Sequence, residues 1–435
     1  MNWRLFEMEN LAAEGGYIKS IKLKNIFLYL TCLAFLTPVA VNLGYWDGKP
    51  IDVVLSDIWL VFFFCGVFLG FIFNSIKVVK PNAMVFLVFL PVFYYILMGT
   101  YGGVTGGGLS NLLSMVRFIK QFIFLIAGWL LYGIYERVLP ACFIKICLML
   151  FLVTFVSSFY YGDFPMGCGA EGRWGGCIFS LDVYGFPNSA ASYFVLLLGM
   201  LMYCASIFQR YRGFIVAAMP VIFVMIFLTL SRAAWVYLAW VSFFGWLFLV
   251  DRSKKIRFLV IGACLLGLAA FLFSLYENTE LGFNALGKIE RNISSDPSSG
   301  RFAIWSQSIA LIKERPFLGY GFSYFSNYVQ GYDTPHNQYL EILFKAGIVG
   351  LFGYALFLML MWHLVKRRKN SLGPGGAAFL GCGVLGGLIF NGMFQPIFSY
   401  SVVANLFMAV LGYLAAATWN KDALSDHSDI DCMSK

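Results

Sequence analysis

Charged residues are scarce in this chain. Only 12% of its 435 residues are charged and 60% are hydrophobic, whereas a soluble protein carries about twice that charged fraction. This shortage of charge excludes an ordinary water-soluble fold. We therefore expect a protein that crosses a lipid bilayer several times, with apolar side chains that face lipid as well as an interior.

Several motifs that would identify a chemistry are also absent. The sequence has no glycine-rich nucleotide-binding loop and no His/Cys cluster with zinc spacing. An Asp-x-Asp pair, which would suggest a divalent metal on a diphosphate, occurs only in the C-terminal tail, as Asp429-Ile430-Asp431. We therefore expect no metal and no cofactor, and arginine or lysine would have to neutralise any bound diphosphate.

Acidic residues are missing from the middle third of every long apolar run. A proton- or sodium-coupled transporter usually needs a carboxylate inside the membrane. The lack of such a carboxylate counts against a small-solute transporter, which is the least favoured function.

Apolar runs of roughly 18–25 residues predict twelve transmembrane helices. The first would be a retained signal anchor, because residues 1–25 lack the pattern of a cleavable signal peptide. The formal net charge of +9 lies in short clusters between the runs. This positive-inside pattern places both termini in the cytoplasm and does not indicate nucleic acid as a partner. The runs are 26–44, 57–76, 82–100, 112–133, 139–160, 189–208, 214–230, 233–250, 258–275, 339–364, 374–394 and 398–418.

The predicted fold class is thus an all-α polytopic membrane protein with one large periplasmic loop that contains short helices. Its helical segment would be Gly300–Ile312, followed by a stop at Pro316 and the turn Gly319-Tyr320-Gly321. An amphipathic helix outside a bundle commonly lies flat on the membrane surface. Its apolar stripe would comprise Phe302, Trp305, Ile309 and Ile312. The expected division is 1–275 for transmembrane helices 1–9 with a smaller periplasmic loop at 161–188, 276–338 for the large loop, 339–418 for helices 10–12 and 419–435 for a cytoplasmic tail.

Two of the ten cysteines, Cys168 and Cys177, share the smaller outer loop. In an oxidising compartment they could close a small disulfide ring. Two free thiols are the other possibility, and the sequence leaves the choice open.

Three lysines and an arginine lie inside apolar runs, where a charge costs roughly 2.5–3.5 kcal/mol on insertion scales. Arg117 and Lys120 share one helical face near the outer side, and each should have a function or a partner. The alternatives are snorkelling for Arg117 and pairing with a helix-end carbonyl for Lys120. We expect Lys145 to snorkel, and Lys345 to form an intrahelical ion pair with the residue four positions earlier, Glu341.

Two further arginines lie on the predicted outer side. Arg232 occupies a connection so short that it must lie at the membrane interface, beside the mouth of the bundle. Arg173 lies in the smaller outer loop. Either could bind an anionic group, and either could instead be a solvated surface charge.

His336 is the most distinctive polar residue, because the chain has three histidines and the other two look peripheral. Thr334 would cap the following helix and Pro335 would occupy its first position. His336 would then lie in the first turn, where the helix dipole favours a neutral ring that can act as a general base. The alternative is a capping or interfacial histidine. Asn337 and Glu341 could orient the ring or the acceptor, or could simply complete the helix start.

These residues form a familiar pattern. His336-Asn337, nine residues, Gly347, two residues and Gly350 resemble the H-[NSQ]-x9-G-x2-[GTY] signature of the O-antigen ligase superfamily. The resemblance covers about 225–410, while the first half matches in hydropathy and in the Gly172-Arg173…Pro187-Asn188 loop. Two other stretches carry it: Gly300-Arg301…Trp305…Arg315-Pro316…Gly319-Tyr320-Gly321 resembles the family's large periplasmic loop, and Ser231-Arg232-Ala233-Ala234-Trp235 resembles its arginine-bearing turn.

The resemblance implies a GT-C-like, metal-independent, inverting glycosyltransferase in the bacterial inner membrane, with its active site facing the periplasm. The donor would be a glycan on undecaprenyl diphosphate, and the acceptor a sugar hydroxyl of lipid A–core. His336 would activate the acceptor while Arg232 and Arg301 hold the diphosphate. An O-antigen polymerase, whose acceptor is another lipid-linked glycan, is the alternative. Arg117 and Arg173 are further candidate diphosphate contacts, and Asn337, Glu341 and Arg315 are candidate supporting residues.

Overall fold

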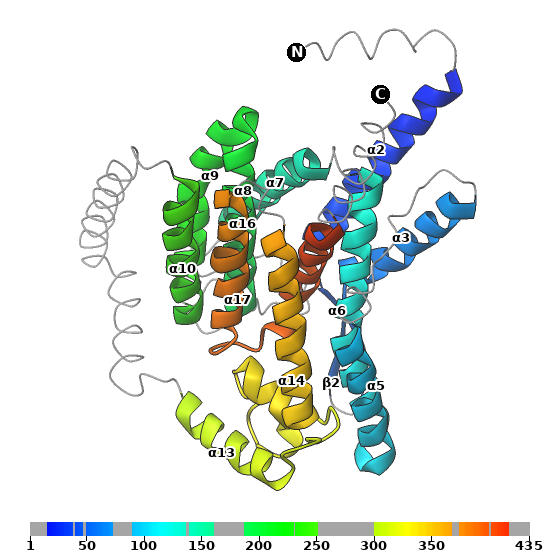
Figure 1. The fold of residues 1–435 in the computed structure, drawn as a ribbon, viewed down its shortest axis with the longest axis vertical. Helices are drawn as coiled ribbons and strands as arrows, with labels where there is room; N and C mark the ends of the chain where they lie inside the picture. The colour runs from blue at the N-terminus through cyan, green and yellow to red at the C-terminus, as the bar shows by residue number, and fades with distance from the viewer. Residues whose placement is uncertain are drawn as a thin grey trace, which may run out of the picture.

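A computed structural model describes residues 15–37, 40–46, 49–72, 89–135, 139–160, 187–229, 231–250, 300–367, 374–399 and 402–416. These residues are almost entirely helical (Figure 1). Several predictions lie outside them: the run 258–275, the tail 419–435, and most of the loop 161–188 with Arg173, Cys168 and Cys177.

Among the residues that the structure describes, six helices are long and apolar enough to cross a membrane, so the chain is a multi-pass membrane protein. They are α3 (Leu55–Ile72), α6 (Gly108–Tyr135), α8 (Pro187–Ile207), α9 (Gln209–Leu228), α10 (Arg232–Leu249) and α14 (Gln338–Arg367). The total of twelve spans stays a prediction. The other helices include α2 (Gly15–Leu36), α5 (Leu90–Gly102), α7 (Leu139–Tyr160), the helix Val402–Ala416, and α16 (Pro374–Ala378), η5 (Phe379–Leu385) and α17 (Gly386–Asn391), which follow one another without a break; the π-helical η1 (Gly103–Gly107) joins α5 to α6.

The predicted span 26–44 is wrong in its second half. Helix α2 ends at Leu36, and a hairpin of β1 (Ala40–Trp46) and β2 (Lys49–Val54) follows, with Ala40 opposite Val54. Pro38 in the sequence disfavours helix at the residue before it. The dipeptide Asp47-Gly48 is typical of a two-residue hairpin turn. These local signals outweigh the apolar composition of the run.

The helices are arranged in two groups with α14 between them (Figure 1). Helices α8, α9, α10, α16 and α17 form one group, and α2, α3, α5 and α6 form the other. Helix α8 is the most deeply buried of the six long helices, with 83% of its apolar stretch inside the protein. Helix α13 (Arg301–Glu314) lies beyond the end of the bundle at which α14 begins.

Helix α14 is bent at Gly347, which the prediction of an uninterrupted span did not include. Gly347 has φ 64° and ψ −167°, and a Cβ there would lie 2.1 Å from the carbonyl oxygen of Phe317. Only glycine accommodates both this conformation and this contact. Backbone groups near the bend bond to the turn 316–322: the N–H of Ile348 donates to the carbonyl of Pro316 at 2.8 Å, and that of Tyr320 donates to Phe344 at 2.7 Å.

Candidate active site

Helix α13 forms where the sequence predicts a helix after Gly300. Its buried face contains Ile304 and Ser308. Ile304 packs in one cluster with Phe344 of α14 and with Tyr320 and Phe325 of the segment that precedes it. Phe302 and Ile309, from the predicted apolar stripe, are 69% and 45% exposed. These two residues face away from the protein, whereas Trp305 and Ile312 of the same stripe are half-buried. The fully buried face, with Ile304 and Ser308, is a neighbouring one that the spacing did not indicate.

A side chain of α13 contacts the loop that contains His336. The indole Nε1–H of Trp305 donates a hydrogen bond to the carbonyl oxygen of Pro335 at 3.1 Å. Arg301 is four residues before Trp305, so the two side chains share a face of the helix. Arg301, the first residue of α13, is thus directed toward the side of the helix on which His336 lies.

The predicted start of the following helix is wrong by three residues. Asn337, and not Thr334, is the N-cap of α14, because its Oδ1 accepts the N–H groups of Tyr339 and Leu340 at 2.9 and 3.1 Å. His336 therefore precedes the cap and has φ 51°, a left-handed conformation that is uncommon outside glycine. Thr334 is used in another way, since its Oγ1 accepts the N–H of His336 at 3.3 Å.

The His336 ring is half-buried, and its environment favours the neutral form. Burial lowers the pKa of His336 below its ordinary value of 6.5, and the positive charge of Arg301 lowers it further. Glu341 and Asp333 oppose the shift with their negative charges. The direction agrees with the neutral ring expected from the sequence, but the cause is burial and Arg301 rather than a place in the first helical turn.

The start of α10 lies at the same end of the bundle as the start of α14. Helix α10 runs antiparallel to α16–α17, since its C-terminal Phe248 lies against Gly375 and Tyr237 lies against Gly387. Immediately after α17, the carbonyl of Gly392 accepts the N–H of Gln338 at 2.8 Å.

Arg232, Arg301 and Arg117 differ in how far they are exposed. Arg232 is the first residue of α10 and its side chain is exposed, whereas Arg301 is half-buried. Arg117 is half-buried on α6, two turns after that helix begins. Arg232 is the first residue of α10 and Arg301 the first residue of α13. Both residues lie at the end of the bundle that contains His336.

Arg315 stabilises the turn after α13. Its guanidinium lies over the ring of Tyr320, 4.8 Å from the ring centroid. The Tyr320 hydroxyl donates a hydrogen bond to Oε2 of Glu314 at 2.8 Å. Burial and this bond raise the pKa of Tyr320 to about 12. Arg315 thus stacks on an aromatic ring close to the Gly347 bend, which is a supporting position.

The predicted ion pair within α14 is confirmed. Nζ of Lys345 lies 2.6 Å from Oε1 of Glu341, whose side chain is 5% exposed. The Ser399 hydroxyl donates to the same oxygen at 2.6 Å. Glu341 therefore completes a buried structural cluster, and its charge also raises the pKa of the His336 ring.

The contact between the segment 392–399 and the His336 loop was not predicted from the sequence. The carbonyl of Met393 accepts a hydrogen bond from Asn337 Nδ2 at 3.0 Å. The N–H of Phe398 donates to Oε1 of Gln338 at 2.8 Å. The available signal was that Gln338 and Gln395 lie at the ends of apolar runs, where a buried amide needs partners. Both side chains are 1% exposed in the structure.

Within the ranges that the structure describes, no group of three or more His, Cys, Asp or Glu side chains is placed to hold a metal ion. The groups around His336 are instead an arginine, an amide and backbone groups, together with the separate carboxylates of Asp333 and Glu341. Such a site offers a proton acceptor beside a positive charge, an arrangement that suits reaction of a hydroxyl with an anionic leaving group.

Comparison with known proteins agrees with the sequence signature. Residues 215–355 match the family described as O-Antigen ligase. This range contains the start of α10, the helix α13 and the His336 loop. An uncharacterized protein of Haemophilus influenzae is 26% identical over 136 residues, which span 27% of this chain and 34% of that relative's length. The family match supports, in general terms, a membrane enzyme of the glycosyltransferase kind, and it confirms for residues 215–355 the resemblance to the O-antigen ligase superfamily.

Proposed function

We propose that this protein transfers a glycan from undecaprenyl diphosphate to a sugar hydroxyl of lipid A–core, at the periplasmic face of a bacterial inner membrane. The observation that carries the proposal is the half-buried His336 beside the charge of Arg301, inside the region that matches the O-antigen ligase family. A base next to a cation is what the attack of a neutral hydroxyl on a diphosphate-activated sugar requires.

In the proposed reaction, a ring nitrogen of His336 takes the proton of the acceptor hydroxyl. The hydroxyl oxygen forms a bond to the anomeric carbon from the side opposite the diphosphate. The bond from that carbon to the diphosphate oxygen breaks, and its electron pair stays on the oxygen. This single displacement inverts the anomeric centre, and the imidazolium then releases its proton to water.

The leaving diphosphate gains negative charge, which arginine can compensate without a metal. Arg301 and Arg232 are the proposed primary ligands, and Arg117 and Arg173 are further ones. Their planar guanidinium groups match two phosphate oxygens at once. The carboxylates of Glu341 and Asp333 act on His336 instead, because their negative charges favour the imidazolium that forms during proton transfer.

Asn337 and Arg315 are proposed to keep these groups in place. Asn337 fixes the chain immediately after His336 through its cap and its bond to Met393. Arg315 stacks on Tyr320 in the turn that joins α13 to the bend of α14. Neither residue needs to contact the substrate in order to affect the rate of transfer.

Transfer from a purified lipid-diphosphate glycan tests the proposal, with lipid A–core and a second donor molecule as competing acceptors. Transfer to lipid A–core supports the ligase, and joining of two donor glycans replaces it with the O-antigen polymerase. The His336→Ala variant should lose transfer, whereas His363→Ala, an exposed histidine near the other end of α14, should keep it. Transfer should also persist in EDTA, and a loss that magnesium restores would contradict the metal-free reaction.

A further inference from the structure

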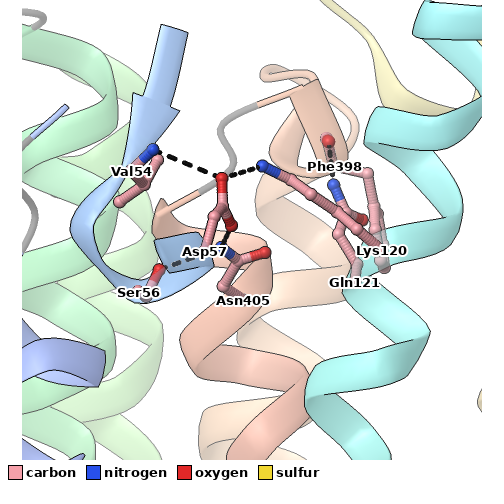
Figure 2. A network of polar contacts seen from close by, with 7 residues as sticks. All are labelled: Val54, Ser56, Asp57, Lys120, Gln121, Phe398 and Asn405. Atoms are coloured by element: carbon pink, nitrogen blue, oxygen red, sulfur yellow. Dashed lines mark hydrogen bonds and ion pairs between the residues drawn. The ribbon is translucent and has the colours of Figure 1, made fainter. Parts of the chain in front are cut away.

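A buried polar network joins the start of α3 to the middle of α6 (Figure 2). Nζ of Lys120 lies 2.5 Å from Oδ2 of Asp57, with side chains 16% and 17% exposed. Asn405 Nδ2 donates to Oδ1 of Asp57 at 3.1 Å and to the Ser56 hydroxyl at 3.2 Å. The N–H of Val54 donates to Oδ2 of Asp57 at 3.3 Å. Both carboxylate oxygens are therefore occupied, and the charge of Lys120 is neutralised by a carboxylate rather than by the helix-end carbonyl considered from the sequence.

The position of the pair makes its charges expensive to separate. Lys120 is twelve residues into α6, roughly 18 Å along the helix axis, and Asp57 is in the first turn of a membrane-spanning helix. Both side chains are mostly buried, so removing one member leaves the charge of the other with little compensation from water, which is destabilising. Lys120 could bind a phosphate only by leaving the mostly buried Asp57 carboxylate without its counter-charge. The arrangement thus disfavours Lys120 as an anion ligand.

The next residue of α6 connects this network to the candidate active site. Nε2 of Gln121 donates to the carbonyl of Phe398 at 2.5 Å, as Figure 2 shows. The N–H of Phe398 donates in turn to Oε1 of Gln338. Gln338 is the first residue of α14 and lies two residues after His336. Helix α6 is therefore held by Asp57 through Lys120 and by the start of α14 through Gln121.

We infer that Asp57 and Lys120 are positioning residues, whose ion pair fixes the rotation and depth of α6 against the end of the bundle that contains His336. Arg117 is one turn before Lys120 on the same helix, so the same constraint sets where its guanidinium points. The inference rests on the proposed function, because it assigns these residues to the transfer reaction without placing them in contact with either substrate.

The two single variants Asp57→Asn and Lys120→Met separate positioning from anion binding. If the pair positions α6, both variants should lower kcat of the folded protein by at least about tenfold, with the KM for the donor within about twofold of wild type. The double variant should be no worse than the poorer single one, because it leaves no charge alone. Lys120→Arg, which keeps the ion pair, should retain transfer if either single variant fails to fold.

Other results would overturn the inference. If Asp57→Asn lowers the KM for the donor while Lys120→Met raises it, Lys120 binds the diphosphate directly. If both variants lower the melting temperature but transfer at the wild-type rate per folded molecule, the pair has only a structural role. Lys145→Met is the control, since this lysine of α7 donates a hydrogen bond to the Tyr29 hydroxyl and contacts neither the Asp57–Lys120 pair nor the Gln121–Phe398 bond. A wild-type chain with no transfer would refute the proposed function itself, whereas wild-type transfer with unaffected variants would refute this inference alone.

Discussion

Trp305 of α13 and Pro335 of the following loop are joined by a hydrogen bond of 3.1 Å from the indole to the carbonyl oxygen. Proline has no N–H, so this carbonyl is the hydrogen-bonding group that its backbone offers. The bond fixes the residue before His336 relative to the helix that Arg301 begins. It therefore sets the distance between a positive charge and the ring whose pKa that charge lowers.

Replacing Trp305 with phenylalanine removes this hydrogen bond and keeps an aromatic ring. A neutral hydrogen bond contributes about 1 kcal/mol, so we expect kcat/KM for transfer to fall roughly fivefold. Trp362→Phe, on an exposed part of α14, is the matched control. Equal activity of Trp305→Phe and wild type would show that the bond does not position His336.

The rate of transfer should depend on pH through His336. The neutral ring is the base and its pKa lies below 6.5, so activity should be constant at neutral pH and lost as the pH falls through that lowered pKa. Arg301→Gln removes a charge that disfavours the imidazolium. The pKa should then rise, and activity should be lost at a higher pH than in wild type. The measurement is kcat/KM between about pH 5 and about pH 8 in both proteins; an unchanged acidic limb would separate Arg301 from the base.

Arg232→Lys should impair transfer although it keeps the positive charge. The ammonium group cannot reproduce the two parallel hydrogen bonds of a guanidinium to a phosphate. We expect the KM for the donor to rise about tenfold, with a smaller change in kcat. Arg210→Lys, at an exposed position near the start of α9, is the control. A Lys variant as active as wild type would reduce Arg232 to a point charge.

Gly347→Ala should destabilise the protein. The residue has φ 64°, and its Cβ would overlap the carbonyl oxygen of Phe317. Strain of this kind costs on the order of 1–3 kcal/mol in the free energy of unfolding, so the melting temperature should fall by several degrees. Gly213→Ala is the control, because a Cβ at Gly213 would meet no atom within 4 Å. If both variants have the same melting temperature, the conformation at Gly347 does not require glycine.

Features that depend on neighbouring residues were predictable from the sequence. The ion pair of Glu341 and Lys345 follows from a spacing of four residues on one helix. The helix after Gly300 follows from its apolar spacing and from Pro316 beyond its end. Both are local, so the sequence alone contains the information that determines them.

Features that depend on distant residues were not predictable. Asp57 and Lys120 are 63 residues apart, and neither sequence neighbourhood names its partner. A threonine before a proline is a common helix start, so the sequence predicts a cap at Thr334. In the structure Asn337 is the cap, and it has an additional partner in Met393. That contact, 56 residues away, favours the later start.

The bend at Gly347 has a consequence for how this protein can be divided. A helix interrupted within a bilayer must find replacement partners for its backbone groups. Here the turn 316–322 supplies them, through Pro316 and Tyr320. Excising the segment around α13 as a water-soluble fragment would remove those partners from both pieces, so the loop and the bundle should fold as a single cooperative unit.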